Sequence, residues 1–249
     1  MSGHSKWATI KHKKGAADKA RAKVFNKIAR QLEVAAREGG ADPTSNASLR
    51  TVIQKAKAAQ MTNDAIDRAV KRGAGLSDGG TYEAITYEGY APGGVAMLVE
   101  VLTDNRNRSS ADVRSTFSKM GGSLAEPGAV GWQFSRRGVL QVNGSDEDTV
   151  MMAALDAGAD DVSADGDAVW RITCDPSIVY EVRDALQAAG LEVASAESTM
   201  VSSVNVEVTD ADDARKILRI MDALEDLDDV QDVYSNFDIS DELMEAVSA

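Results

Sequence analysis

The sequence predicts an α+β protein of several domains, with a small all-α N-terminal domain followed by two ferredoxin-like α/β domains, one inserted in the other. Three observations predict this class. Apolar residues recur at helical spacing up to about residue 72 and at strand-type spacing afterwards. A glycine-rich stretch at 73–80 separates the two regions. From residue 138 the elements follow the order β-α-β-β-α-β, which is the ferredoxin-like order.

The N-terminal domain, at about residues 18–72, is predicted to contain three helices. The first begins at Asp18 and stops at the glycine pair 39–40. The second covers about 45–59, and the third follows the N-cap Thr62, carries Asp64 in its first turn and ends at Gly73. The residues expected to face inward are Val24, Phe25, Ile28, Leu32 and Ala35 in the first helix, and Leu49, Val52, Ile53 and Ala56 in the second.

The central α/β domain is predicted to open with a hairpin. Strands at 82–90 and 95–102 flank the connection at 91–94, and the second strand is apolar on both faces, as expected for a covered central strand. A helix is expected to begin at Ser109, because Ser109 and Asp112 have capping-box spacing. This helix should bury Val113, Phe117 and Met120, and a further strand is expected at 129–134.

The inserted domain is predicted from a strand at 138–142, a hairpin at 160–174 around Asp165-Gly166, and a last strand at 191–196. Its first helix should be capped at Ser145 and its second should have Asp175 as N-cap and Pro176 as first helical residue, ending at Gly190. The inward residues are expected to be Val150, Met151, Ala154 and Leu155 in the first helix, and Val179, Val182 and Leu186 in the second.

The C-terminal segment is predicted to return to the central domain. It has a strand at 201–208, a helix capped at Thr209, and a strand at 230–236. The helix should bury Ile217, Leu218, Met221 and Leu224. These elements lack a sheet of their own, so we expect them to join the elements at 82–134. The predicted domains are therefore 1–77 for the basic arm and helices, 78–134 with 203–249 for the central domain, and 135–202 for the insertion.

Charge is distributed unevenly along the chain. The whole sequence has 27 Lys and Arg against 40 Asp and Glu, a net charge of −13. The first 75 residues hold 16 basic residues against 6 acidic ones, whereas residues 76–249 hold 11 against 34. A basic segment on an acidic protein predicts a polyanionic partner for that segment, because lysines release counterions from a phosphate backbone.

The predicted nucleic-acid-binding residues are concentrated in this basic segment. Residues 2–16 show no regular spacing, which is typical of a flexible cationic arm, and Trp7 offers a ring on which a base can stack. A solvated cationic helix face is the alternative for the residues that follow. The full set is Lys6, Trp7, Lys11, His12, Lys13, Lys14, Lys19, Arg21, Lys23, Lys27, Arg30, Arg106 and Arg108.

Arg106 and Arg108 belong to a second polar cluster, Asn105-Arg106-Asn107-Arg108, which precedes a predicted helix N-terminus. Helix N-termini favour anions, so the cluster could hold a phosphate. The alternative is a loop held by its own asparagine side chains. The sequence leaves both interpretations open.

Other function classes find little support in the sequence. Cys174 is the single cysteine, which excludes an intrachain disulfide and is typical of a reducing cytosol. The N-terminus lacks the apolar segment of a signal peptide, and no apolar run is long enough to cross a membrane, so we expect a cytoplasmic protein. No metal-ligand spacing, phosphate-binding loop or nucleophile–base pair is recognisable. We therefore expect no metal, no cofactor, no membrane or small-molecule partner, and no enzymatic activity.

Four segments carry a resemblance to a known family: GHSKWATIKHKK at 3–14, YEGYAPGG at 87–94, TDNRNR at 103–108 and SKMGGSL at 118–124. Together they resemble the YebC/PmpR family, which includes the mitochondrial translational activator of cytochrome oxidase subunit one. The resemblance covers essentially the whole chain. It implies an all-α N-terminal domain followed by two α/β domains, one inserted in the other.

For function, the resemblance implies a non-enzymatic regulator of gene expression with two alternatives. Many members are described as transcriptional regulators that bind promoter DNA, which is the function expected first. Others associate with the ribosome and ease translation of difficult stretches such as proline tracts. The expected partners are therefore promoter DNA, or the ribosome and its RNA. The sequence leaves the oligomeric state open, with a monomer as one alternative.

Overall fold

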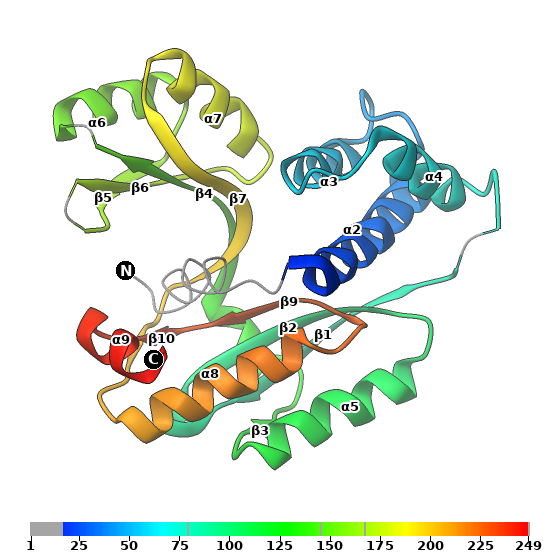
Figure 1. Cartoon of the computed structure of the whole chain (residues 1–249), viewed down its shortest axis with the longest axis vertical. Helices are drawn as coiled ribbons and strands as arrows, with labels where there is room; N and C mark the ends of the chain where they lie inside the picture. The colour runs from blue at the N-terminus through cyan, green and yellow to red at the C-terminus, as the bar shows by residue number, and fades with distance from the viewer. Residues whose placement is uncertain (1–16, 79, 145, 167, 249) are drawn as a thin grey trace. The chain divides into compact units, whose positions relative to one another are not determined.

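The structure is a computed structural model that describes residues 17–248, apart from residues 79, 145 and 167. The chain divides into two compact units (Figure 1). One unit is Phe134–Val201, and the other contains the described residues up to Gln133 and from Ser202 onward. Helices form the N-terminal region and two four-stranded sheets follow, so the predicted α+β class is confirmed. No helix among the described residues is both long and apolar enough to span a bilayer.

The N-terminal region contains three helices, α2 (Ala17–Gly39), α3 (Ala47–Ala58) and α4 (Asn63–Gly73). Asn46 caps α3 by accepting the Leu49 amide, and Thr62 caps α4, as predicted. The core of this region is formed by Ile28, Leu32, Ala35, Ala36, Leu49, Ala56, Met61, Ile66 and Ala69. Val24 is 45% exposed, so its predicted inward position is wrong.

Gly73 sets the distance between α2 and α4. A Cβ atom at this position would lie 2.2 Å from the backbone oxygen of Glu33 on α2. The Arg72 Nη2 atom on α4 lies 2.6 Å from a carboxylate oxygen of Glu33 on α2, and this ion pair links the two helices. The close approach requires a glycine, because α2 and α4 pack backbone against backbone here.

The central sheet has the strand order β3-β1-β2-β9 and is antiparallel throughout. Its strands are β1 (Glu83–Tyr90), β2 (Ala96–Thr103), β3 (Ser123–Leu124) and β9 (Val230–Ser235). The predicted pairing of the C-terminal segment with the hairpin is present, because β9 lies beside β2. This sheet has four strands, as a ferredoxin-like sheet does, but β1 and β2 form a hairpin before helix α5 (Arg106–Lys119).

Two helices, α5 (Arg106–Lys119) and α8 (Ala211–Glu225), lie side by side on one face of this sheet (Figure 1). Met97, Val99 and Val101 of β2 point into the core between the sheet and these helices. Seven of the eight residues of β2 are buried, as predicted for a covered central strand. A short parallel pair, β8 (Val206–Glu207) with β10 (Phe237–Asp238), and helix α9 (Asp241–Ser248) complete the unit.

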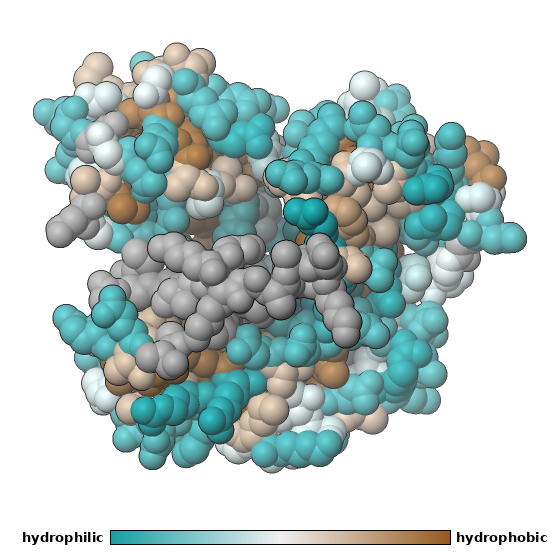
Figure 2. Space-filling model, viewed as in Figure 1, coloured by the Kyte–Doolittle hydropathy of each residue, from teal (hydrophilic) through white to brown (hydrophobic). Residues whose placement is uncertain are grey.

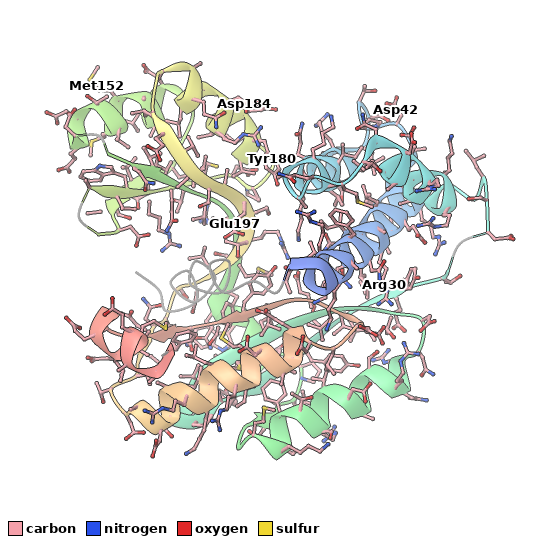
Figure 3. The ribbon with its side chains drawn as sticks, in the orientation of Figure 1. Arg30, Asp42, Met152, Tyr180, Asp184 and Glu197 are labelled. Atoms are coloured by element: carbon pink, nitrogen blue, oxygen red, sulfur yellow. The ribbon has the colours of Figure 1, made fainter. Side chains whose placement is uncertain are left out.

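The inserted unit has the order β4-α6-β5-β6-α7-β7, and its sheet order is β5-β6-β4-β7, as in a ferredoxin-like domain. The strands are β4 (Phe134–Asn143), β5 (Asp161–Ala164), β6 (Val169–Cys174) and β7 (Glu192–Ser202). Helices α6 (Glu147–Asp156) and α7 (Val179–Ala188) supply much of the core. Met151 and Leu155 are 38% and 60% exposed, so their predicted burial is wrong. Met152, labelled in Figure 3, belongs to the same helix.

Four predicted N-caps are displaced in the structure. Helix α5 is capped by Asn105 rather than Ser109, and α8 by Asp210 rather than Thr209. Asp146 caps α6 instead of Ser145, which lies outside the described residues. Asp175 accepts the Ser177 amide in a turn, so α7 begins only at Val179. For α5, α6 and α8 several cap-forming side chains lie near the helix start, and one other than the predicted residue accepts the helix amide. Helix α7 follows Ile178 and has no side-chain cap.

Two predicted strands are also shorter or absent. The segment 129–134 turns through a 3₁₀ helix at Gly131–Gln133, and strand structure begins only with Phe134. At 201–208 the chain leaves β7 at Ser202 and regains strand pairing only at Val206–Glu207. Both interruptions lie where the chain passes from one unit to the other, at Gln133–Phe134 and at Val201–Ser202. Ser203 donates its amide to the Gln133 carbonyl there at 2.8 Å.

Candidate nucleic-acid interface

The predicted nucleic-acid-binding residues fall into three groups in the structure. Those of the arm, Lys6, Trp7, Lys11, His12, Lys13 and Lys14, lie outside the described residues. Lys19 belongs to α2, but its side chain is outside the described part as well. Arg21, Lys23, Lys27 and Arg30 follow along α2, and Arg106 and Arg108 occupy the first turn of α5.

Three cations of α2 bind the chain around the C-terminal end of α8. Lys23 donates to the backbone and side-chain oxygens of Asp226, and Lys27 donates to the Glu225 carbonyl at 2.9 Å. Arg30 donates to the Asp228 carbonyl at 2.7 Å. Helix carbonyls at a C-terminus carry partial negative charge, so lysine and arginine are favourable there. These side chains therefore attach α2 to an acidic segment of the same unit, defined here as the 225–229 segment.

Arg30 connects this contact to a buried acidic residue. Its Nη1 atom lies 3.0 Å from Oδ1 of Asp229, and its guanidinium lies over the Tyr82 ring, 5.4 Å from the centroid. Arg30 itself is labelled in Figure 3. Only 24% of the Arg30 side chain and 10% of the Asp229 side chain are exposed. The pair is thus shielded from solvent much more than the Lys23–Asp226 pair, whose carboxylate side is 83% exposed.

Asp229 also accepts hydrogen bonds from the first turn of α5. Its Oδ2 atom accepts hydrogen bonds from Arg108 Nη2 at 2.7 Å, from Ser109 Oγ at 2.7 Å and from Thr103 Oγ1 at 3.1 Å. Ser109 and Thr103 are buried, so their hydroxyls have little access to water. One carboxylate therefore joins α2, the end of β2 and the start of α5, and we name this set the Asp229 cluster.

The protonation of Asp229 follows from these contacts. Burial by itself would raise the pKa of the carboxyl, but the hydrogen bonds from Arg108, Ser109 and Thr103 outweigh burial and lower it. The same contacts raise the pKa of Arg108, through the hydrogen bonds to Asp229 and Asp104. Both groups are charged at neutral pH, and the cluster is an ion pair with hydroxyl donors.

The cluster 105–108 has features of both sequence interpretations. Asn105 accepts the Arg108 amide and caps α5, so its side chain does organise the backbone. Arg108 pairs with Asp104 at 2.8 Å as well as with Asp229, and Arg106 pairs with Glu83 at 3.1 Å. The two arginines are thus neutralised by carboxylates of this unit, and a phosphate at this helix N-terminus would compete with those carboxylates.

Other basic residues of the N-terminal helices are exposed, and most of them are not among the predicted nucleic-acid-binding residues. Arg21, Lys57, Arg68 and Lys71 are exposed, and none forms an ion pair with another described residue. Arg68 and Lys71 are three residues apart on α4, which puts them on neighbouring positions of one helix face. The signal that could have found them is the shortage of acidic residues at 43–63 and 68–77.

An exposed tryptophan is another surface feature that sequence analysis missed. Trp132 is 71% exposed, and its Nε1 atom donates to the Ala129 carbonyl at 3.2 Å. The preceding loop is held by Glu88, whose carboxylate accepts the amides of Gly128, Val130 and Gly131 at 2.6–2.7 Å. Trp132 therefore presents a large aromatic ring to solvent. In the view of Figure 2 most of the described surface is hydrophilic.

Groups suited to metal or thiol chemistry are not gathered in the described part of the chain. No cluster of three or more His, Cys, Asp or Glu there could hold a metal ion. Cys174 is fully buried, and burial, reinforced by Asp160 and Asp175, raises the pKa of its thiol to about 11. A thiol in that environment stays protonated at neutral pH and is a poor nucleophile.

The fold and this surface define a class: a multidomain α+β protein with a basic helical domain and an inserted ferredoxin-like unit. Residues 5–76 match the family described as the TACO1/YebC protein N-terminal domain, and residues 82–237 match the TACO1/YebC second and third domain. The chain therefore belongs to the TACO1/YebC family, as its sequence motifs indicate.

Full-length relatives support this assignment. A protein of Beutenbergia cavernae is 56% identical over 248 residues, covering 98% of both chains, and one of Rubrobacter xylanophilus is 54% identical over 251 residues, covering 100% of both. Both bear the name "Probable transcriptional regulatory protein". The crystal structure of a conserved hypothetical protein from Aquifex aeolicus superposes with a TM-score of 0.77 at 41% identity, covering 90% of this chain and 93% of that one.

Proposed function

We propose that this protein is a non-enzymatic, nucleic-acid-binding regulator of gene expression that contacts phosphates through its basic N-terminal region. The observation that carries the proposal is the charge division of the chain, with 16 basic against 6 acidic residues up to residue 75 and 11 against 34 beyond it. The relatives bear the name "Probable transcriptional regulatory protein", which supports the same role.

The contacts of the described residues refine which cations would bind phosphate. Lys23, Lys27 and Arg30 are engaged by the 225–229 segment, and Arg106 and Arg108 by carboxylates. Their role in this proposal is to position the helical domain. The phosphate contacts are assigned to Lys6, Lys11, Lys13, Lys14, Lys19 and Arg21, with Lys57, Arg68 and Lys71 as an added set on α3 and α4. Trp7 and His12 are assigned to base stacking and hydrogen bonding.

DNA is the partner proposed first, in line with the names of the relatives. The described helices include no evident base-reading helix in a helix-turn-helix register. The expected binding is therefore strong in electrostatics and weak in sequence preference. This feature also favours the alternative, a ribosome-associated translation factor, because RNA is recognised by shape, backbone and stacking. Retention on promoter DNA and co-sedimentation with ribosomes distinguish the two partners.

The test is the salt dependence of binding. If about six phosphates are neutralised, the logarithm of the affinity for duplex DNA falls against the logarithm of salt concentration with a slope of about −5. The variant Lys13→Glu with Lys14→Glu should bind at least about tenfold more weakly at physiological salt, because two phosphate contacts are removed. Fluorescence anisotropy with labelled DNA and RNA measures both quantities.

A matched control is available in the inserted unit. Arg137→Glu with Arg183→Glu changes the net charge equally, at positions that pair with Asp160 and Asp184. Equal loss of affinity in the two double variants would mean that only net charge matters, and the arm would have no specific role. Binding of the wild-type protein that does not respond to salt would contradict the proposal itself.

A further inference from the structure

An open pocket of about 570 Å³ lies on the α/β body, and the N-terminal helices contribute no residue to its lining. Its lining consists of Pro92, Lys119, Met120, Gly121, Lys216 and Arg219. Three of these six residues are basic and none is acidic. The body from residue 76 onward has three times as many acidic as basic residues, 34 against 11, so such a grouping is not a consequence of composition.

The positions of these cations follow from the packing of α5 and α8. Helix α8 buries Ile217, Ile220 and Met221, which leaves Lys216 and Arg219 exposed on its outer side, three residues apart. Helix α5 ends at Lys119, and the backbone then turns at Gly121, whose φ angle is +85°. The two helices lie side by side (Figure 1), so their cations reach one pocket.

Glycine at the end of α5 keeps the chain close to the sheet. A Cβ atom at Gly122 would lie 2.8 Å from the Tyr90 carbonyl oxygen and 3.0 Å from Phe117. Gly121 has a left-handed conformation with open space around it, so no side chain projects into the mouth of the pocket. The segment SKMGGSL therefore has a physical role, because it turns the chain tightly and leaves the pocket open.

The charges of the pocket are only slightly compensated. Lys119 and Arg219 are exposed and form no ion pair within the described residues, and Lys216 reaches Asp213 only at 3.4 Å with half of its side chain exposed. By contrast, Arg215 on the same helix pairs with Asp212 at 2.9 Å. The C-terminal dipole of α5 offsets part of the charge of Lys119, but two further cations remain. Like charges gathered in one place repel each other, and a bound anion removes that repulsion.

The chemistry of the lining fits a phosphodiester. Arginine offers parallel donors that match two phosphate oxygens, and lysines add point charges. Pro92 and Met120 provide apolar walls against which a sugar can pack, and the volume is within the usual range of ligand sites. We propose that this pocket holds a backbone phosphate of the bound nucleic acid, a second contact on the α/β body. This proposal rests on the nucleic-acid binding proposed above.

The test compares two double variants of the full chain. Lys119→Gln with Arg219→Gln removes the two uncompensated cations of the pocket. Arg114→Gln with Arg215→Gln removes the same charge from the same two helices but from residues outside the lining. The pocket variant should bind short single-stranded RNA or duplex DNA about fivefold more weakly at physiological salt, and its salt slope should fall by about 1. The control variant should bind within twofold of wild type.

The outcomes separate this proposal from the previous one. Salt-dependent binding of wild type that is equally strong in both double variants overturns the pocket alone. Absence of any nucleic-acid binding by wild type overturns both proposals. Inorganic phosphate, used as a competitor, distinguishes a free anion from a nucleic-acid phosphate. Its binding to the pocket is detected as shifted amide resonances at 119–122. If phosphate binds there while the affinity for nucleic acid is unchanged, the pocket serves a free anion and the proposal is wrong. Thermal melts of both variants show that the fold is intact.

Discussion

Replacement of Asp229 tests whether one carboxylate holds the helical domain to the α/β body. Asp229→Ala leaves Arg30, Arg108 and the buried hydroxyls of Ser109 and Thr103 without their shared acceptor. Removing one member of a buried ion pair costs about 3 to 5 kcal/mol. Arg108 is 46% exposed and keeps Asp104, which reduces the loss. We therefore expect the free energy of unfolding to fall by about 3 kcal/mol, at the lower end of that range.

The assay is urea unfolding followed by circular dichroism, with Asp229→Asn as a variant of unchanged volume. The asparagine keeps one acceptor but loses the charge, so a loss of about 2 kcal/mol is expected. Asp226→Asn is the matched control, because its side chain is 83% exposed in its pair with Lys23, and exposed pairs contribute less than about 1 kcal/mol. If Asp229→Ala unfolds at the same urea concentration as the control, the cluster does not stabilise the fold and the reasoning fails.

Three further predictions concern acid, packing and thiol chemistry. The pKa of Asp229 is lower in the folded than in the unfolded protein. The stabilisation by its charged form is therefore complete above about pH 4, the unfolded pKa, and is lost as the pH falls through the folded pKa. The difference in Tm between wild type and Asp229→Asn should narrow on acidification. Gly73→Ala should lower the free energy of unfolding by about 2 kcal/mol or more, since its Cβ would lie 2.2 Å from the Glu33 carbonyl oxygen; unchanged urea unfolding would show that α2 and α4 can separate without cost. Cys174 should react with iodoacetamide at pH 7.5 at least about a hundredfold faster in urea than in the native state, because the native thiol is buried and its pKa is about 11. Mass spectrometry follows the reaction, and equal rates would contradict the burial of the thiol.

Helix and strand identity could be predicted because it depends on local periodicity. The apolar spacing of Ile28, Leu32 and Ala35, and of Ile217, Leu218 and Met221, predicted buried faces that the structure confirms. The turn around residues 165–166 could be predicted for the same reason, since a few consecutive residues determine it.

Helix starts were less predictable because capping is a competition among neighbours. Ser109 has the spacing of a capping residue, yet Asn105 caps α5 and places Ser109 inside the helix. There its hydroxyl meets Asp229, which is 120 residues away in sequence. A partner at that separation leaves no local signal, so the sequence could not show that Ser109 belongs to a buried cluster rather than to a cap.

The candidate site shows the same limit for charge. The sequence predicted a basic segment, but it did not show which cations are already engaged. Lys23, Lys27 and Arg30 meet the 225–229 segment across about 200 positions of sequence, and three scattered residues, Lys119, Lys216 and Arg219, meet in one pocket. Composition can indicate that a surface is cationic, whereas the cations available to a ligand depend on tertiary contacts.

The chain enters the inserted unit after Gln133 and leaves it before Ser202. The amide and hydroxyl of Ser203 both donate to the Gln133 carbonyl, at 2.8 and 3.2 Å. These hydrogen bonds hold the two ends of the inserted segment together, so that the segment forms a closed loop. A long insertion destabilises the fold little, because lengthening a closed loop tenfold costs only about 2 kcal/mol of closure free energy. The inserted ferredoxin-like unit is therefore a separable module. We expect that it can be exchanged for a short turn, or for a foreign domain with adjacent ends, while the hairpin, its two covering helices and the basic helices retain their fold.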